Sequence, residues 1–195
     1  MLRLPLLIAL SLAIAFGGGI WSTLVALDAT IGFGAIRLGA WEAFPQAQTA
    51  AADPYAKSHR ANAGKLLYGT AEGLTFMAAV DDNGARLDGN CTYRMSGHTP
   101  PARLWSLFTN DANGRPPSES AELPEALNSR TVLRDRDGDF VIDISASAHP
   151  GNWLAVRAGQ PFRLVLTLFD TPTAGSSGLI DLAMPKVEKI GCGNA

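Results

Sequence analysis

The chain has 195 residues, of which 17% are charged, and its formal net charge is −2. This length suits one domain and leaves little room for two, and the balanced charge provides no basic surface, so nucleic acid is not expected as a partner. The 20 glycines and 12 prolines, most of them after residue 60, are typical of a turn-rich all-β domain.

The amino-terminal segment is long and apolar. No charged residue occurs from Leu4 to Leu27, and a helix of this length, at about 1.5 Å per residue, exceeds the hydrocarbon core of roughly 30 Å. A cleaved signal peptide has a shorter apolar region followed by a small-x-small site. Ala13-Ile14-Ala15 has that pattern but lies inside the apolar run. We therefore expect residues 1–28 to form an uncleaved signal-anchor transmembrane helix, with cleavage as the alternative.

The charges that flank this segment indicate its orientation. Arg3 precedes the apolar run and Asp28 follows it. Because positive residues are retained on the cytoplasmic side, the carboxy-terminal domain is expected on the outer side of the inner, cytoplasmic membrane, after a single pass. Gly17, Gly18 and Gly19 would permit close contact with another membrane helix.

Residues 29–52 are expected to be a juxtamembrane segment and linker. Trp41 within them marks either the outer membrane interface or the protein core. Asp53-Pro54 then has the chemistry of an N-cap followed by the first helical residue, because the aspartate accepts free amide protons and proline needs no acceptor there. A short helix is expected from Pro54 to Leu66.

Residues 53–195 are expected to form one β-sandwich domain. From Phe162 to Asp170 apolar side chains alternate with a mixed set, which is typical of a half-buried antiparallel strand. Asn83-Gly84 indicates a tight turn, and residues 131–133 are expected to pair with residues 140–145. The full set of expected strands is 74–80, 91–96, 103–109, 131–133, 140–145, 162–170 and 187–190.

This spacing of short strands predicts an all-β fold, namely an antiparallel, jelly-roll-like sandwich preceded by one transmembrane helix and a short α-helix. The two cysteines, Cys91 and Cys192, bear on its compartment. An even count outside the cytoplasm favours a disulfide that ties the carboxy terminus to an early strand. The alternatives are two free buried thiols or, less favoured, a metal pair.

Several segments together carry a resemblance to a known family: DPYAKSHRANAGKLLYGTAEGL, NCTYRMSGHTPPARLWSL, RDGDFVIDISASAHPGNWL, RLVLTLFDTP and the final Gly191-Cys192. The chain resembles the domain-of-unknown-function 1214 family, in its short, membrane-anchored form from Gram-negative, especially alphaproteobacterial, envelopes. The resemblance implies an antiparallel jelly-roll sandwich in the periplasm and no settled activity. The chain departs from the family pattern at Ala155 and at Phe108-Thr109-Asn110.

The titratable residues do not form a metal-binding pattern. Residues 135–143 have the oxygen spacing of some calcium loops, but Phe140 stands where a glycine is expected, and Arg134 and Arg136 compete for the carboxylates. A solvated hairpin turn is therefore expected. The histidines occur singly and lack zinc-site spacing, so neither a metal nor a cofactor is expected; they are His59, His98 and His149.

Six residues remain that combine aromatic faces with polar donors, a combination that holds small polar ligands such as sugars or carboxylates. The alternative is that both tryptophans pack in the core and that Asn152 bonds its own turn. The six candidate ligand-binding residues are Tyr93, Arg94, Trp105, Asn152, Trp153 and Arg163.

No nucleophile elbow or phosphate loop is present in the sequence. The leading hypothesis is therefore a non-enzymatic envelope protein that binds a small ligand or a protein partner. The second hypothesis is a hydrolase or lyase acting on polar envelope or imported compounds, with a site around Arg94, His98 and Asn152. The third is a structural role, in which the protein braces an envelope complex through its membrane helix.

Overall fold

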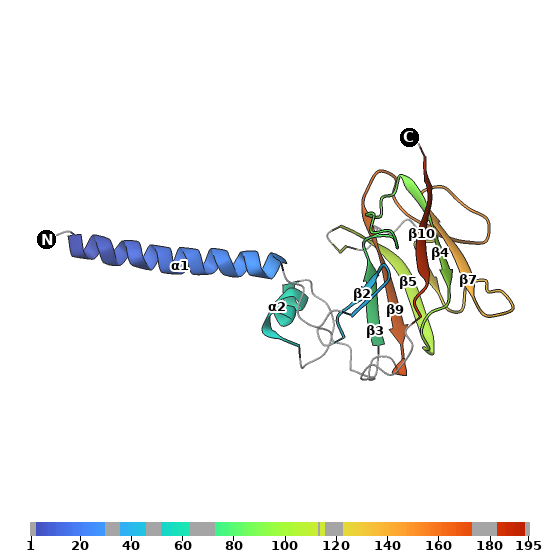
Figure 1. Ribbon diagram of the computed structural model, residues 1–195, viewed down its shortest axis with the longest axis horizontal. Coiled ribbons are helices and arrows are strands. Elements are labelled where there is room, and N and C mark those ends of the chain that lie inside the picture. Colours follow the sequence, from blue (N-terminus) through green and yellow to red (C-terminus); the bar gives the residue numbers. More distant parts are fainter. Residues whose placement is uncertain are drawn as a thin grey trace.

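Figure 1 shows a computed structural model of the chain, which describes residues 3–29, 36–45, 52–62, 73–112, 114–115, 123–172 and 183–193. Helix α1 (Arg3–Ala29) lies apart from the rest, and its side chains are exposed as far as they are described. Of the helices in these ranges, α1 is long and apolar enough to cross a membrane, over Arg3–Val25. An amino-terminal signal sequence can also meet these criteria of length and composition.

Helix α2 (Pro54–Asn62) begins where its capping chemistry predicts. The carboxylate Oδ1 of Asp53 accepts the Ala56 backbone N–H at 3.1 Å, which is the hydrogen bond expected of an N-cap. The expected end of the helix at Leu66 lies outside the described residues.

The described strands form two sheets, which confirms a mostly β, sandwich-like fold. The six-stranded sheet has the order β1 (Ile36–Leu38), β2 (Trp41–Ala43), β3 (Gly73–Ala78), β9 (Phe162–Phe169), β5 (Leu104–Asp111), β6 (Ala126–Asn128). The four-stranded sheet has the order β10 (Lys186–Cys192), β4 (Cys91–Gly97), β7 (Phe140–Ser145), β8 (Asn152–Ala155). The jelly-roll order of the connections stays a prediction.

The core lies between the two sheets. Alternate side chains of β9, the strand with the clearest sequence pattern, are buried there: Phe162, Leu164, Leu166 and Leu168. From the facing sheet, Met95 and Ile142 are completely buried in the same cluster. The opposite face of β9 also buries Val165 and Thr167, so this strand is more enclosed than the expected half-buried strand.

Three sequence predictions about pairing are wrong. Strands β7 and β8 run parallel, so the sandwich is not wholly antiparallel. Residues 131–133 form a turn after β6 instead of a strand, and only a single bridge joins Arg134 to Phe140. Strand β7 instead pairs with β4 and β8. Strand β4 is distant from β7 in sequence, whereas β8 follows β7 directly along the chain but runs parallel to it. Periodicity alone predicts neither pairing.

The segment expected to be a linker contributes two strands. Strands β1 and β2 form a hairpin, with Gly39 at φ +58°, and β2 pairs with β3 at the edge of the six-stranded sheet. Trp41 is only 1% exposed and belongs to the core cluster, so it does not mark the membrane interface. The first sheet strand therefore begins at Ile36, shortly after α1 ends at Ala29.

The predicted disulfide is present. Cys91 and Cys192 are directly opposite each other on β4 and β10 and are bonded, with a sequence separation of 101 residues. This bond ties the last strand to the first strand of its sheet along the chain. Beside it, the register shifts between Lys189 and Gly191.

Candidate functional site

A row of functional side chains crosses the outer face of the four-stranded sheet, the face that points away from the core. Because the strands are in register, Glu188 on β10 lies opposite Arg94 on β4, Arg94 opposite Asp143 on β7, and Asp143 opposite Trp153 on β8. We call Glu188, Arg94, Asp143 and Trp153 the cross-sheet row. Strand alternation places it outside, since neighbours such as Tyr93 and Ile142 point into the core.

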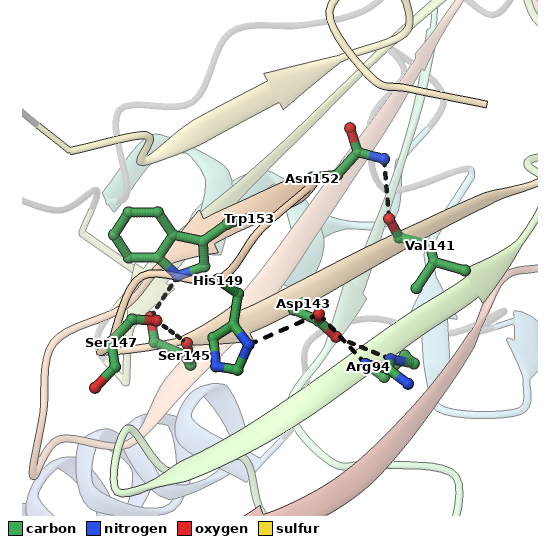
Figure 2. Close-up of polar contacts among 8 residues, drawn as sticks. All are labelled: Arg94, Val141, Asp143, Ser145, Ser147, His149, Asn152 and Trp153. Carbon is green, nitrogen blue, oxygen red and sulfur yellow. Dashed lines mark hydrogen bonds and ion pairs between the residues drawn. The ribbon is translucent and has the colours of Figure 1, made fainter.

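Arg94 and Asp143 form a two-point ion pair at the centre of the row (Figure 2). Arg94 Nε lies 2.9 Å from Asp143 Oδ1, and Nη2 lies 3.3 Å from Oδ2. The hydrogen bond with this carboxylate raises the pKa of Arg94 above its ordinary value. The Arg94 side chain is 47% exposed and that of Asp143 only 12%. The guanidinium therefore stays accessible to solvent while it holds a nearly buried carboxylate.

His149 and Trp153 flank this pair. The His149 Nδ1 lies 3.9 Å from Asp143 Oδ2, and in Figure 2 the imidazole lies between the indole and the carboxylate. The Trp153 Nε1 donates to the Ser145 carbonyl oxygen at 3.1 Å, which fixes one edge of the ring while the side chain remains partly exposed. Ser145 Oγ donates to the Ser147 carbonyl oxygen.

A shallow hollow of about 320 Å³ adjoins Asp143. Its wall includes Val141, the turn residues Pro150 and Gly151, and Asn152. Gly151 adopts φ +85°, a conformation that glycine accommodates without strain. Asp143 belongs to the cross-sheet row and also lines this hollow, so together they form one candidate site.

The Asn152 side chain is hydrogen-bonded to backbone groups at the rim of the hollow. Its Oδ1 accepts the Leu133 N–H at 2.7 Å, and its Nδ2 donates to the carbonyl oxygens of Leu133 at 2.8 Å and Val141 at 2.9 Å. It therefore bonds two neighbouring segments and not its own turn. The amide positions this part of the site and has no donor left for a ligand.

Two of the six predicted ligand-binding residues lie in the core. Tyr93 is buried, and its hydroxyl accepts the Asp88 N–H at 2.9 Å and donates to the Arg86 carbonyl oxygen at 3.3 Å. Burial raises the pKa of Tyr93, and the hydrogen bond from the Asp88 backbone opposes this effect. Trp105 is 3% exposed and packs against Phe140 with ring centroids 5.3 Å apart.

Of the other predicted residues, Arg94 and Trp153 share the outer face, with Asn152 beside them. Arg163 lies on the other sheet, opposite Asn110 of β5. The sequence reasoning did not include Asp143, His149 and Glu188 among the ligand-binding candidates. Alternation gave a signal for Asp143, which is a single charged residue between Ile142 and Ile144.

Two residues of the enzyme hypothesis, His98 and Asn152, are bonded to other protein groups. His98 follows the end of β4, where its Nδ1 lies 3.0 Å from Asp139 Oδ1, while Asn152 is committed to backbone groups. Asp135 Oδ1 accepts the N–H groups of Asp137 and Asp139, at 3.0 and 2.9 Å, as in a hydrogen-bonded hairpin turn. In the part of the chain that the structure describes, no three His, Cys, Asp or Glu side chains form a possible metal site.

The fold and site thus define a two-sheet β-sandwich with an amino-terminal apolar helix and a polar site on one outer face. Residues 72–173, more than half of the chain, match the model of a family described as protein of unknown function (DUF1214). The chain belongs to this family.

The fold is similar to that of a solved bacterial structure. The VPA0106 protein from Vibrio parahaemolyticus is 23% identical with a TM-score of 0.56, over 71% of this chain and 36% of that one. An uncharacterised protein from Burkholderia cenocepacia is 21% identical with a TM-score of 0.45, over 78% of this chain and 36% of that one. The chain thus spans about a third of the length of each. No curated protein matches the sequence.

Proposed function

We propose that this protein is a membrane-anchored envelope protein that binds a small polar ligand on the outer face of its four-stranded sheet. The apolar helix α1, as a signal or an anchor, and the Cys91–Cys192 disulfide both support a location outside the cytoplasm. The finer proposal is that residues 1–28 remain as a single-pass anchor in the inner membrane. The sandwich of residues 53–195, extended by β1 and β2, then lies in the periplasm.

One observation carries the binding proposal: a partly exposed tryptophan shares a register row with an accessible ion pair. Trp153 offers an aromatic surface, and Arg94 and Asp143 offer donors and acceptors in a fixed two-point arrangement. Binding sites for small molecules combine apolar surface with a few fixed polar groups in this way. The hollow beside Asp143 supplies the concave surface that such a ligand requires.

A hydrolase or lyase is the alternative function. His149 beside Asp143 has the order of a base and its orienting carboxylate, although 3.9 Å exceeds a hydrogen-bond distance. The hydroxyl of the adjacent Ser145 is buried and donates to a carbonyl oxygen, so it is not poised as a nucleophile. Binding without chemistry therefore accounts for the arrangement with fewer assumptions.

The binding proposal is tested by ligand-dependent thermal unfolding of the full-length oxidised protein in detergent, against sugars, organic acids and divalent metals. A ligand at about 100 times its dissociation constant adds about 2.7 kcal/mol to stability. We expect Trp153→Leu and Arg94→Gln to abolish the shift caused by the active class. Arg86→Gln removes one exposed positive charge away from the row and is the matched control. A shift that persists in both row variants would place the ligand elsewhere.

The location is tested separately in cells. A carboxy-terminally tagged full chain should sediment with inner membranes, and added protease should digest it only after the outer membrane is opened. The mass of the recovered protein distinguishes a retained anchor from a cleaved signal peptide. Protection from protease in such cells would contradict a periplasmic sandwich.

A further inference from the structure

We infer that the ligand of the cross-sheet row is a neutral, hydroxyl-rich ring, which is the chemistry of an uncharged sugar, and not an organic anion. This inference rests on the proposed function, because it names the ligand class of the same site. Its evidence is the state of the two central charged groups: Arg94 and Asp143 are paired with each other before any ligand arrives.

The guanidinium of Arg94 is not a free anion-binding group. Two of its nitrogens already contact Asp143, and Glu188 lies opposite it on the other side. An anion would have to displace Asp143, whose carboxylate is nearly buried and would lose its partner. The row itself contains two carboxylates and one guanidinium, so it carries no excess of positive charge that would attract an anion.

The charged groups around the hollow lead to the same conclusion. Three aspartates, Asp135, Asp139 and Asp143, line the hollow together with one arginine, Arg134. Arg134 Nη1 donates to the Gly138 carbonyl oxygen at 2.7 Å, and its guanidinium lies over the rings of Trp105 and Phe140. The positive charge is thus committed within the protein, and the excess of carboxylates disfavours a negative ligand.

A sugar hydroxyl suits a paired site because it donates and accepts at once. One hydroxyl can donate to Asp143 while its neighbour accepts from Arg94, and the ion pair stays intact. The apolar face of a sugar ring can pack against the exposed part of the Trp153 indole, which the bond to the Ser145 carbonyl oxygen holds in place. A hollow of about 320 Å³ exceeds a single six-membered sugar ring in size.

The experiment compares ligands that share a ring and differ in charge. Glucose, galactose and N-acetylglucosamine are titrated in parallel with glucuronate and galacturonate, and citrate serves as an acyclic anion, all at one ionic strength. Thermal unfolding and tryptophan fluorescence of the full-length protein in detergent are the measurements. We expect the neutral sugars to bind at least about tenfold more tightly than their uronates, the loss expected when a charged group meets an already satisfied partner.

Two variants sharpen the comparison. Trp153→Phe keeps an aromatic ring and should retain most of the neutral-sugar response, whereas Trp153→Leu should lose it. Asp143→Asn releases Arg94, so it should weaken neutral-sugar binding and strengthen uronate binding. If Asp143→Asn fails to fold, the ratio of sugar to uronate affinity in the unmodified protein still decides the question.

The outcomes separate the two claims. Tighter binding of uronates or citrate, abolished by Arg94→Gln, would overturn the neutral-sugar inference and leave the proposed binding function in place. No response to any of these ligands, together with no response in the wider screen described above, would overturn both.

Discussion

The indole Nε1 of Trp41 donates a hydrogen bond of 2.7 Å to the carbonyl oxygen of Pro185, 144 residues further along the chain. The bond connects the hairpin that follows the apolar helix to the segment that precedes the last strand. Asp82 reinforces the connection, because its carboxylate accepts the N–H groups of Ala40 at 3.0 Å and Val187 at 2.8 Å. The start and end of the sandwich are thereby held to each other.

Substitution of Trp41 should show what this connection contributes. Trp41→Phe keeps most of the buried ring but leaves the Pro185 carbonyl oxygen without its partner, which we expect to lower the free energy of unfolding by about 1–3 kcal/mol. Trp41→Ala should cost about 3–5 kcal/mol because it also opens a cavity. Denaturant unfolding measures both values. Equal losses would mean that the hydrogen bond carries the whole effect.

Truncation provides a second test of the same region. A chain that begins at residue 50 lacks β1, β2 and the buried Trp41, whereas one that begins at residue 31 retains them. We expect the longer chain to unfold cooperatively at a clearly higher temperature, since the shorter one exposes the edge of β3. Thermal unfolding of the two purified chains decides this. Identical melting temperatures would show that the hairpin is dispensable.

Loss of the disulfide should destabilise the sandwich. Cys91→Ser with Cys192→Ser releases a loop of 101 residues, for which the chain-entropy relation gives at most about 4.7 kcal/mol and typical proteins about 2–4 kcal/mol. The free energy of unfolding is measured for the oxidised protein, the reduced protein and the double variant. We expect the last two to have similar values, well below that of the oxidised protein. If the reduced protein is as stable as the oxidised one, the pairing of β10 with β4 holds the last strand in place, and the disulfide does not.

Tyr93 should make stability sensitive to alkaline pH. Its folded pKa is raised by burial above the ordinary 10.0, so the unfolded chain releases the phenolic proton first. The stabilisation is complete below pH 10 and is lost as pH rises through the folded pKa. The stability difference between the wild type and Tyr93→Phe, measured in denaturant between pH 8 and about 11, should be constant at first and then shrink. A difference that does not change over this range would contradict the assignment.

Asn152 should behave as a structural residue. Asn152→Asp keeps the acceptor for the Leu133 N–H but replaces two donors by a carboxylate that faces the carbonyl oxygens of Leu133 and Val141. We expect it to lower the free energy of unfolding by about 1–3 kcal/mol. Asn152→Ala, which lacks the repulsion, is the control and should cost less. A variant that keeps its stability but loses ligand binding would show that Asn152 contacts the ligand directly.

The sequence allowed the prediction of those features that depend on local chemistry. The alternation in β9, the Asp53 cap and the pairing of the only two cysteines all rest on neighbouring residues or on a count, and the structure contains each of them. The hairpin of β1 and β2 was missed because three-residue strands give too short a pattern and acquire their stability from distant partners such as Pro185.

The candidate site was predicted only in part, for a geometric reason. Tyr93 and Arg94 are adjacent on one strand, so their side chains point to opposite faces and cannot contact the same ligand. This conflict was already visible in the sequence. The partnership of Arg94 with Asp143 was not visible, because it depends on which strands become neighbours.

The short interval between α1 and β1 has a consequence for where the protein can act. Between Ala29 and Ile36 the chain can extend by no more than about 25 Å. If the helix is retained, the sandwich stays close to the membrane and reaches only the layer of periplasm next to the lipid. Its effective targets are then molecules that arrive at the membrane surface, and not those dissolved deeper in the compartment.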